Sequence, residues 1–139
     1  MPHIMALSDR KVLEYKKVGK IVIEPFKREN LATSSYDVTL GEWFYREQAP
    51  KYNHSLYNIW NEEHVRHVWG AGKVERAVTA KEAFKKYKFE WKGISPNDKV
   101  IMLRPGETIL AHTNEFIGGR DTVTTMMKAR SSMGRNFIE

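Results

Sequence analysis

The sequence predicts a mostly β protein, a sandwich or barrel of short strands. Three observations predict this class: apolar and polar residues alternate over short stretches, β-branched residues gather in them, and Gly or Pro residues separate them. A chain of 139 residues is long enough for one domain with a single core. We expect one domain over residues 1–139, with a short N-terminal helix and a partly helical insertion.

The N-terminal helix is expected over residues 9–18. Ser8 can act as its N-cap by accepting a hydrogen bond from a backbone N–H that has no partner within the helix. Gly19 stands where a glycine commonly follows the last turn. The β-branched stretch of residues 20–24, ended by Pro25, then predicts a strand.

Two alternating stretches predict half-buried strands. Residues 36–40 form the first, which Gly41 is expected to end. Residues 123–130 form the second, which runs into the pair Ser131-Ser132. We expect both strands to belong to the main sheet structure.

The remaining strands are expected around glycine and proline turns. Pro105 and Gly106 are a typical central pair of a type II turn, and they separate predicted strands over residues 99–103 and 107–112. The pair Gly118-Gly119 is expected to form another break in the chain.

Residues 46–97 differ from the flanking sequence because they are polar and aromatic. Two pieces in this stretch have helical character, near residues 61–69 and 79–87. We interpret residues 46–97 as an insertion between strands. We expect it to pack on the outside of the barrel and not to form a separate domain.

Composition limits the chemistry and the partners. The net charge of +6 and the isoelectric point near 9.5 favour an anionic partner, although scattered lysines are also typical of a solvated surface. The absence of cysteine excludes disulfides, thiol nucleophiles and cysteine-based metal sites. Apolar runs are shorter than the roughly 18 residues of a membrane span, and a signal-peptide pattern is absent, so we expect a cytoplasmic protein.

The last part of the chain contains the components of a phosphate-binding loop. Ser131 and Ser132 offer two adjacent hydroxyl donors, and Gly134 allows an anion to approach the backbone closely. Arg130 and Arg135 offer planar guanidinium groups that bind phosphate through paired hydrogen bonds. A plain basic turn is the alternative interpretation of the same residues.

The sequence resembles the dCTP deaminase/dUTPase family at four places in the right order. The matching motifs are LSD at residues 7–9 with IEPF at 23–26, SSYDVTLG at 34–41, LRPGETILAHT at 103–113, and ARSSMGR at 129–135. The resemblance implies a distorted jelly-roll barrel of the dUTPase-like type. It also implies a homotrimer with active sites at the subunit contacts.

The resemblance assigns roles to the residues of the loop. It implies that the triphosphate is bound by the side chains of Arg130, Ser131, Ser132 and Arg135. Met133 and Gly134 are expected to supply loop backbone. Ser131 is also expected to position the attacking water. Mg²⁺ is expected to arrive bound to the nucleotide, as is common for a cation that uses substrate phosphates as ligands.

The resemblance also implies deamination without zinc. Zinc deaminases need cysteine ligands, which this chain lacks. The family instead uses a glutamate as proton shuttle, on a strand well downstream of the loop. Glu139 follows Arg135 too closely to be that residue, so we expect the catalytic glutamate and the last strands to be missing and the sequence to be a fragment of a longer protein.

Several functions stay open. The leading hypothesis is deamination of dCTP to dUTP, with possible coupling to diphosphate release that yields dUMP; dUTP diphosphatase activity alone is the alternative within the family. Three alternative hypotheses come from other functional classes: a non-catalytic nucleotide-binding or regulatory protein, an inactive fragment, and a nucleic-acid-binding module. The module would use aromatic residues for base stacking, although aromatics are more often core residues.

Other candidate site residues have structural alternatives. His64 and His67 could hold a metal on one helical face, but a solvated helix is favoured. His112 is expected to be a hydrogen-bonded histidine of the core or of an interface. Asp37 matches an aspartate that lies near the metal in dUTPases, and hydrogen bonding to nearby backbone is the favoured alternative.

Overall fold

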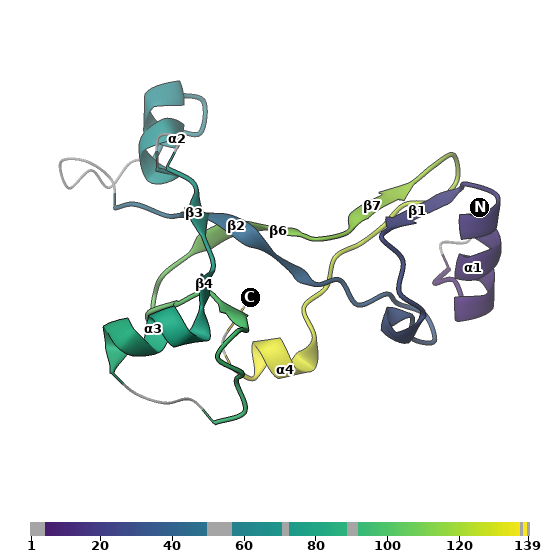
Figure 1. The fold of residues 1–139 in the computed structure, drawn as a ribbon. Coiled ribbons are helices and arrows are strands. Elements are labelled where there is room, and N and C mark those ends of the chain that lie inside the picture. The colour runs from purple at the N-terminus through teal and green to yellow at the C-terminus, as the bar shows by residue number, and fades with distance from the viewer. Residues whose placement is uncertain (1–4, 50–56, 71–72, 89–91, 137, 139) are drawn as a thin grey trace. The chain divides into compact units, whose positions relative to one another are not determined.

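The computed structural model describes residues 5–49, 57–70, 73–88, 92–136 and 138. The chain forms two compact units (Figure 1). The first unit combines Met1–Val38 with Glu115–Glu139, and the second is Thr39–Asn114. Both are built from short antiparallel strands and short helices, as the sequence predicts for a mostly β protein.

The first unit is organised around one antiparallel strand pair. Its elements in chain order are α1 (Asp9–Lys17), β1 (Ile21–Glu24), the 3₁₀ helix η1 (Arg28–Asn30), β7 (Phe116–Gly119) and α4 (Ser131–Gly134). β1 pairs with β7, and Ile23 lies opposite Ile117. Ile21, Ile23 and Leu31 supply its buried apolar side chains.

The predicted N-terminal helix and strand are confirmed. The Ser8 side chain accepts a hydrogen bond from the backbone N–H of Lys11, at 3.4 Å, which makes Ser8 the N-cap of α1. The helix ends at Lys17, and β1 then occupies the β-branched stretch. In β1 the burial alternates so that Ile21 and Ile23 face the interior.

The second unit contains two small sheets and two helices. Its elements are β2 (Leu40–Arg46), α2 (Glu62–Val68), β3 (Glu75–Arg76), β4 (Val78–Thr79), α3 (Ala80–Tyr87), β5 (Lys99–Val100) and β6 (Ile109–Thr113). One sheet has the order β3-β2-β6, and the other pairs β4 with β5. The buried apolar side chains are Phe44, Val68, Ala77, Ala80 and Ala83.

The two predicted helices of the second unit are confirmed, and each has a polar cap. The Asn61 side chain accepts hydrogen bonds from two backbone N–H groups in the first turn of α2. In α3, Thr79 and Glu82 form a capping box. The positions of these helices could be predicted from the sequence because a cap is an interaction between residues that are close in the sequence.

The turn at Pro105-Gly106 is also confirmed. Gly106 has a φ of +78°, and the backbone N–H of Glu107 donates to the carbonyl of Arg104 at 3.0 Å, as a type II turn requires. The strands on either side do not pair with each other. β5 pairs with β4, whereas β6 pairs with β2.

Gly41 was predicted to end a strand, and this is wrong, because it is the second residue of β2. The pair Gly118-Gly119 was predicted to break the chain; the two glycines are the last two residues of β7, and the strand ends directly after them. A Cβ on Gly41 would stand 2.1 Å from the imidazole of His112 on β6. A Cβ on Gly119 would stand 2.2 Å from the carbonyl oxygen of Val123. These two glycines permit close approach within a strand, which is a known role of strand glycines.

The strand predicted over residues 36–40 is shifted, and the one over 123–130 is not formed. In the first region Tyr36 makes a single bridge to Leu31, and the regular strand begins only at Leu40. Residues 123–130 lie outside the regular elements and are mostly exposed. Alternation alone does not form a strand, because a strand needs a neighbouring strand to pair with its backbone.

The architecture fits the expected dUTPase-like class, with small antiparallel sheets and a few short helices; no closed barrel forms among the described residues. The predicted insertion, residues 46–97, falls within the second unit. Its interpretation as an insertion into a single domain stays a prediction. No helix in the described ranges has the length and apolarity that a bilayer crossing requires.

Candidate functional site

The candidate phosphate-binding loop folds as a single helical turn. Arg130 is the N-cap of α4, and Arg135 is its C-cap. The backbone N–H of Gly134 donates to the carbonyl of Arg130 at 3.2 Å, and that of Arg135 donates to the carbonyl of Ser131 at 3.0 Å. The two serines therefore lie at the start of a turn, with the two arginines at its ends.

The loop is open to solvent. Ser131, Ser132, Gly134 and Arg135 are all exposed, and Met133 is 43% exposed. Outside its chain neighbours and the backbone of its own helix, a Cβ on Gly134 would meet no described atom within 4 Å. The space around the turn is therefore accessible to a ligand.

The charges of the loop are mainly positive. Arg130 makes an ion pair with Asp37, with 2.9 Å between Nη2 and Oδ2. The side chain of Arg130 is 71% exposed and that of Asp37 is 38% exposed, so the pair lies at the surface. Within the described part of the chain, the guanidinium of Arg135 has no carboxylate within salt-bridge distance. Among the described residues, Arg130 is thus paired with a carboxylate and Arg135 is not.

Asp37 has a side-chain partner that the sequence did not suggest. Its backbone N–H donates to the carbonyl of Asn30 at 2.8 Å, but its carboxylate contacts Arg130. Asp37 and Arg130 are far apart in the sequence, so no local pattern predicts their contact. In the described ranges, no group of three potential metal ligands includes Asp37.

His64 and His67, weighed as metal ligands, and His112, predicted to be a hydrogen-bonded histidine of the core or of an interface, all lie close to backbone atoms. His64 Nδ1 lies 3.3 Å from the backbone nitrogen of Asn58, and His67 Nε2 lies 2.8 Å from the carbonyl oxygen of Ala49. His112 is exposed, and its Nδ1 lies 2.8 Å from the carbonyl oxygen of Thr113. Glu139, which was weighed and rejected as the catalytic glutamate, lies outside the described residues.

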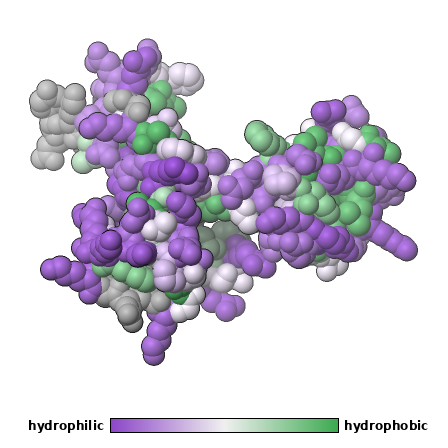
Figure 2. All heavy atoms as spheres, in the orientation of Figure 1, coloured by the Kyte–Doolittle hydropathy of each residue, from purple (hydrophilic) through white to green (hydrophobic). Residues whose placement is uncertain are grey.

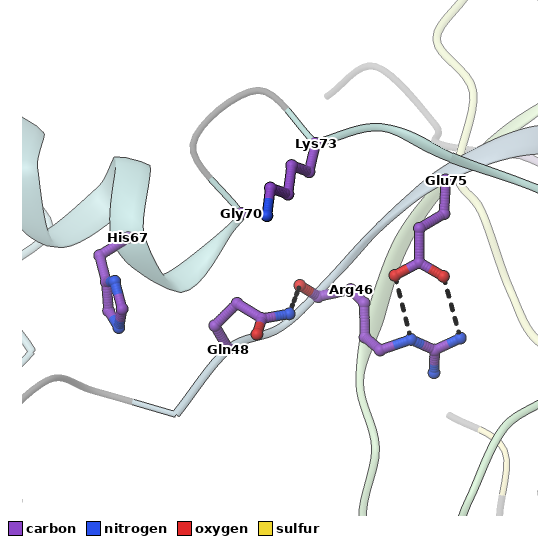
Figure 3. A pocket seen from close by; sticks show the side chains of 6 residues that line it. All are labelled: Arg46, Gln48, His67, Gly70, Lys73 and Glu75. Carbon is purple, nitrogen blue, oxygen red and sulfur yellow. Dashed lines mark hydrogen bonds and ion pairs between the residues drawn. The ribbon is translucent and has the colours of Figure 1, made fainter.

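A separate cleft of about 280 Å³ lies in the second unit (Figure 3). Its lining residues are Arg46, Gln48, His67, Gly70, Lys73 and Glu75. Arg46 makes ion pairs with Glu75 and with Glu107, so its charge is neutralised within the protein. The cleft therefore offers an anion less positive charge than its residue types suggest.

Comparisons with known proteins agree with the motifs. Residues 6–139 match the family model described as dCTP deaminase-like. A protein of Methanococcus vannielii is 28% identical over 143 residues, covering 97% of this chain and 61% of that protein. A protein of Hydrogenobaculum is 30% identical over 139 residues, covering 97% of this chain and 60% of that protein. Both are named "dCTP deaminase, dUMP-forming".

The chain spans about three fifths of the length of these relatives, namely 61% and 60%. The part that it spans includes both the N-terminal helix and the loop from Arg130 to Arg135. The family model covers the chain almost from end to end, from residue 6 to residue 139. The chain therefore belongs to the dCTP deaminase-like family.

Proposed function

We propose that the protein deaminates dCTP and releases diphosphate, so that dUMP is the product. The family match supports dCTP as the substrate, and the names of the relatives support dUMP as the product. The observation that carries the proposal is the exposed turn from Arg130 to Arg135, which lies within the matched segment. It offers hydroxyl and guanidinium donors to a triphosphate.

Each part of the turn has a distinct task in this proposal. The hydroxyls of Ser131 and Ser132 donate to phosphate oxygens, and the guanidinium of Arg135 binds phosphate through two parallel hydrogen bonds. Met133 and Gly134 leave the backbone accessible. Mg²⁺ enters with the nucleotide and neutralises the phosphates, so the protein itself needs to supply no complete set of metal ligands.

The overall reaction consumes two water molecules. One water adds to C4 of cytosine and ammonia leaves, and a second water attacks the α-phosphorus and diphosphate leaves. Ser131 is proposed to position a water. The glutamate that moves protons in this family is not assigned to any of the 139 residues. Zinc independence, homotrimeric assembly and a cytoplasmic location stay predictions from the family resemblance and composition.

The proposal is tested in two steps. First, the protein encoded by the whole gene is incubated with Mg·dCTP or Mg·dUTP, and the products are separated by chromatography. Formation of dUMP from dCTP supports the proposal. Accumulation of dUTP alone restricts the activity to deamination, conversion of dUTP alone indicates a dUTP diphosphatase, and no reaction contradicts enzymatic function.

Second, binding of Mg·dUTP to the 139-residue chain is measured by calorimetry for the wild type and for Arg135→Ala. Loss of a paired, charge-assisted hydrogen bond is expected to weaken binding about 10- to 100-fold. Arg10→Ala is the matched control, because Arg10 is an exposed arginine on α1 and its removal changes the net charge equally. Equal weakening by both variants would indicate general electrostatic attraction in place of a built phosphate site.

A further inference from the structure

We infer that Asp37 is a positioning residue for the phosphate-binding turn. This inference rests on the proposed function and deepens it. The carboxylate of Asp37 would hold the guanidinium of Arg130 in the orientation in which it meets the triphosphate. Two segments far apart in the sequence would then build one site, with a loop carboxylate orienting the N-cap arginine of α4.

The geometry of the pair allows this role. Nη2 of Arg130 lies 2.9 Å from Oδ2 of Asp37. A guanidinium has five N–H groups arranged along more than one edge. An ion-pair contact at one terminal nitrogen leaves the other N–H groups of Arg130 for a phosphate, and its 71% exposed side chain can be reached from solvent.

The position of Asp37 is itself fixed by neighbouring backbone. The backbone N–H of Asp37 donates to the carbonyl of Asn30 at 2.8 Å, and Tyr36 forms a bridge with Leu31. By contrast, the chain preceding Arg130 lies outside the regular elements and is mostly exposed. The ion pair therefore connects the start of the turn to a better-anchored part of the same unit.

Energetics favour a positioning role over a stabilising one. Exposed ion pairs contribute little to folding because water and salt screen them. Holding a long side chain in place before binding reduces the conformational entropy that is lost when a ligand orders it. The pair is thus better suited to prepare Arg130 for an anion than to stabilise the unit.

The test uses the 139-residue chain, with Mg·dUTP and inorganic tripolyphosphate as probes in calorimetric titrations. Asp37→Asn should weaken binding of both probes about threefold to tenfold, the cost of ordering one flexible side chain. In an Arg130→Ala background, Asp37→Asn should have no further effect. The thermal unfolding midpoint should change little, in contrast to what a purely structural role would give.

Asp9→Asn is the matched control, because Asp9 and Arg28 form an ion pair of similar exposure in the same unit, with 3.7 Å between the charged atoms. It should leave binding of both probes unchanged. Tighter binding by Asp37→Asn would show that the carboxylate competes with phosphate, and unchanged binding would remove any role; either result overturns the inference alone. Absence of binding by the wild type would instead overturn the proposed function, and the inference with it.

Discussion

At the scale of single residues, the arginines of this protein differ in how they are neutralised. Arg76 is engaged by two neighbours in the second unit: its guanidinium donates to Glu42 at 2.8 Å and lies 4.9 Å from the centre of the Trp43 ring. The hydrogen bond from Arg76 lowers the pKa of Glu42, and the same bond raises the pKa of Arg76. Arg135, in the candidate site, has no comparable carboxylate among the described residues.

The Glu42–Arg76 pair predicts a pH dependence of stability. Because the pKa of Glu42 is lowered in the folded protein, its contribution is present above the unfolded pKa and is lost as pH falls through the folded pKa. Glu42→Gln should therefore reduce the loss of thermal stability between about pH 5 and about pH 3. The effect is expected to be small, because the pair is accessible to solvent.

Glu47→Gln provides the comparison for this pH experiment. Glu47 is an exposed carboxylate next to the end of β2, and no ion pair involves it in the described part of the chain. Its substitution should leave the difference between the unfolding midpoints at the two pH values unchanged. If Glu42→Gln behaved in the same way as Glu47→Gln, the pair would have no measurable role in acid sensitivity.

At the scale of elements, the sequence predicts what depends on local interactions. The helices α1, α2 and α3 are found where polar caps such as Ser8 and Thr79 precede them. In the candidate site, the residues that form the turn could be predicted from their types. The contact between Asp37 and Arg130 could not, because it joins distant segments and depends on the tertiary fold.

Strand boundaries were harder to predict because they depend on the neighbouring strands, which come from distant parts of the sequence. The strand beginning at Leu40 runs through Gly41, since the His112 ring on β6 occupies the space of a side chain. No local pattern shows that ring. Residues 123–130 alternate as a strand would, yet they have no ladder partner in the described structure. Alternation of apolar and polar residues shows that the two faces of an extended segment would differ in polarity. A strand also needs a neighbouring strand that pairs with its backbone.

Two adjacent glycines in β7 provide a matched test of close approach. A Cβ at position 119 would lie 2.2 Å from the backbone carbonyl oxygen of Val123, whereas a Cβ at position 118 would lie 3.7 Å from Val22. Gly119→Ala should therefore destabilise the protein by about 1–3 kcal/mol, because backbone has to move. Gly118→Ala should have a smaller effect. The free energy of unfolding in urea measures both.

The glycine comparison has a clear contrary outcome. If Gly118→Ala and Gly119→Ala lowered the free energy of unfolding equally, the contact at Val123 would not determine the cost. Both substitutions lie in the same strand and add the same methyl group, so differences in intrinsic strand preference cancel. The remaining difference reports the space available at each position.

At the scale of the whole molecule, the surface combines a positive net charge with many exposed apolar side chains. Hydrophilic residues cover much of the visible face, with apolar patches between them (Figure 2). Met126 and Met127 are each 79% exposed, and both lie in the alternating stretch that lacks a ladder partner. Exposed apolar groups of this kind commonly mark surfaces of association.

The family resemblance predicts a homotrimer, and the exposed methionines make the prediction testable. Sedimentation of the chain at increasing concentration should approach three times the monomer mass of 16.2 kDa. Met127→Lys should shift this equilibrium toward monomer, because burying a lysine charge in an apolar contact is costly. Met5→Lys, at a similarly exposed position outside the stretch (76% against 79%), should not. A monomer at every concentration would contradict the trimer, and equal effects of both substitutions would show that charge, and not this segment, controls association.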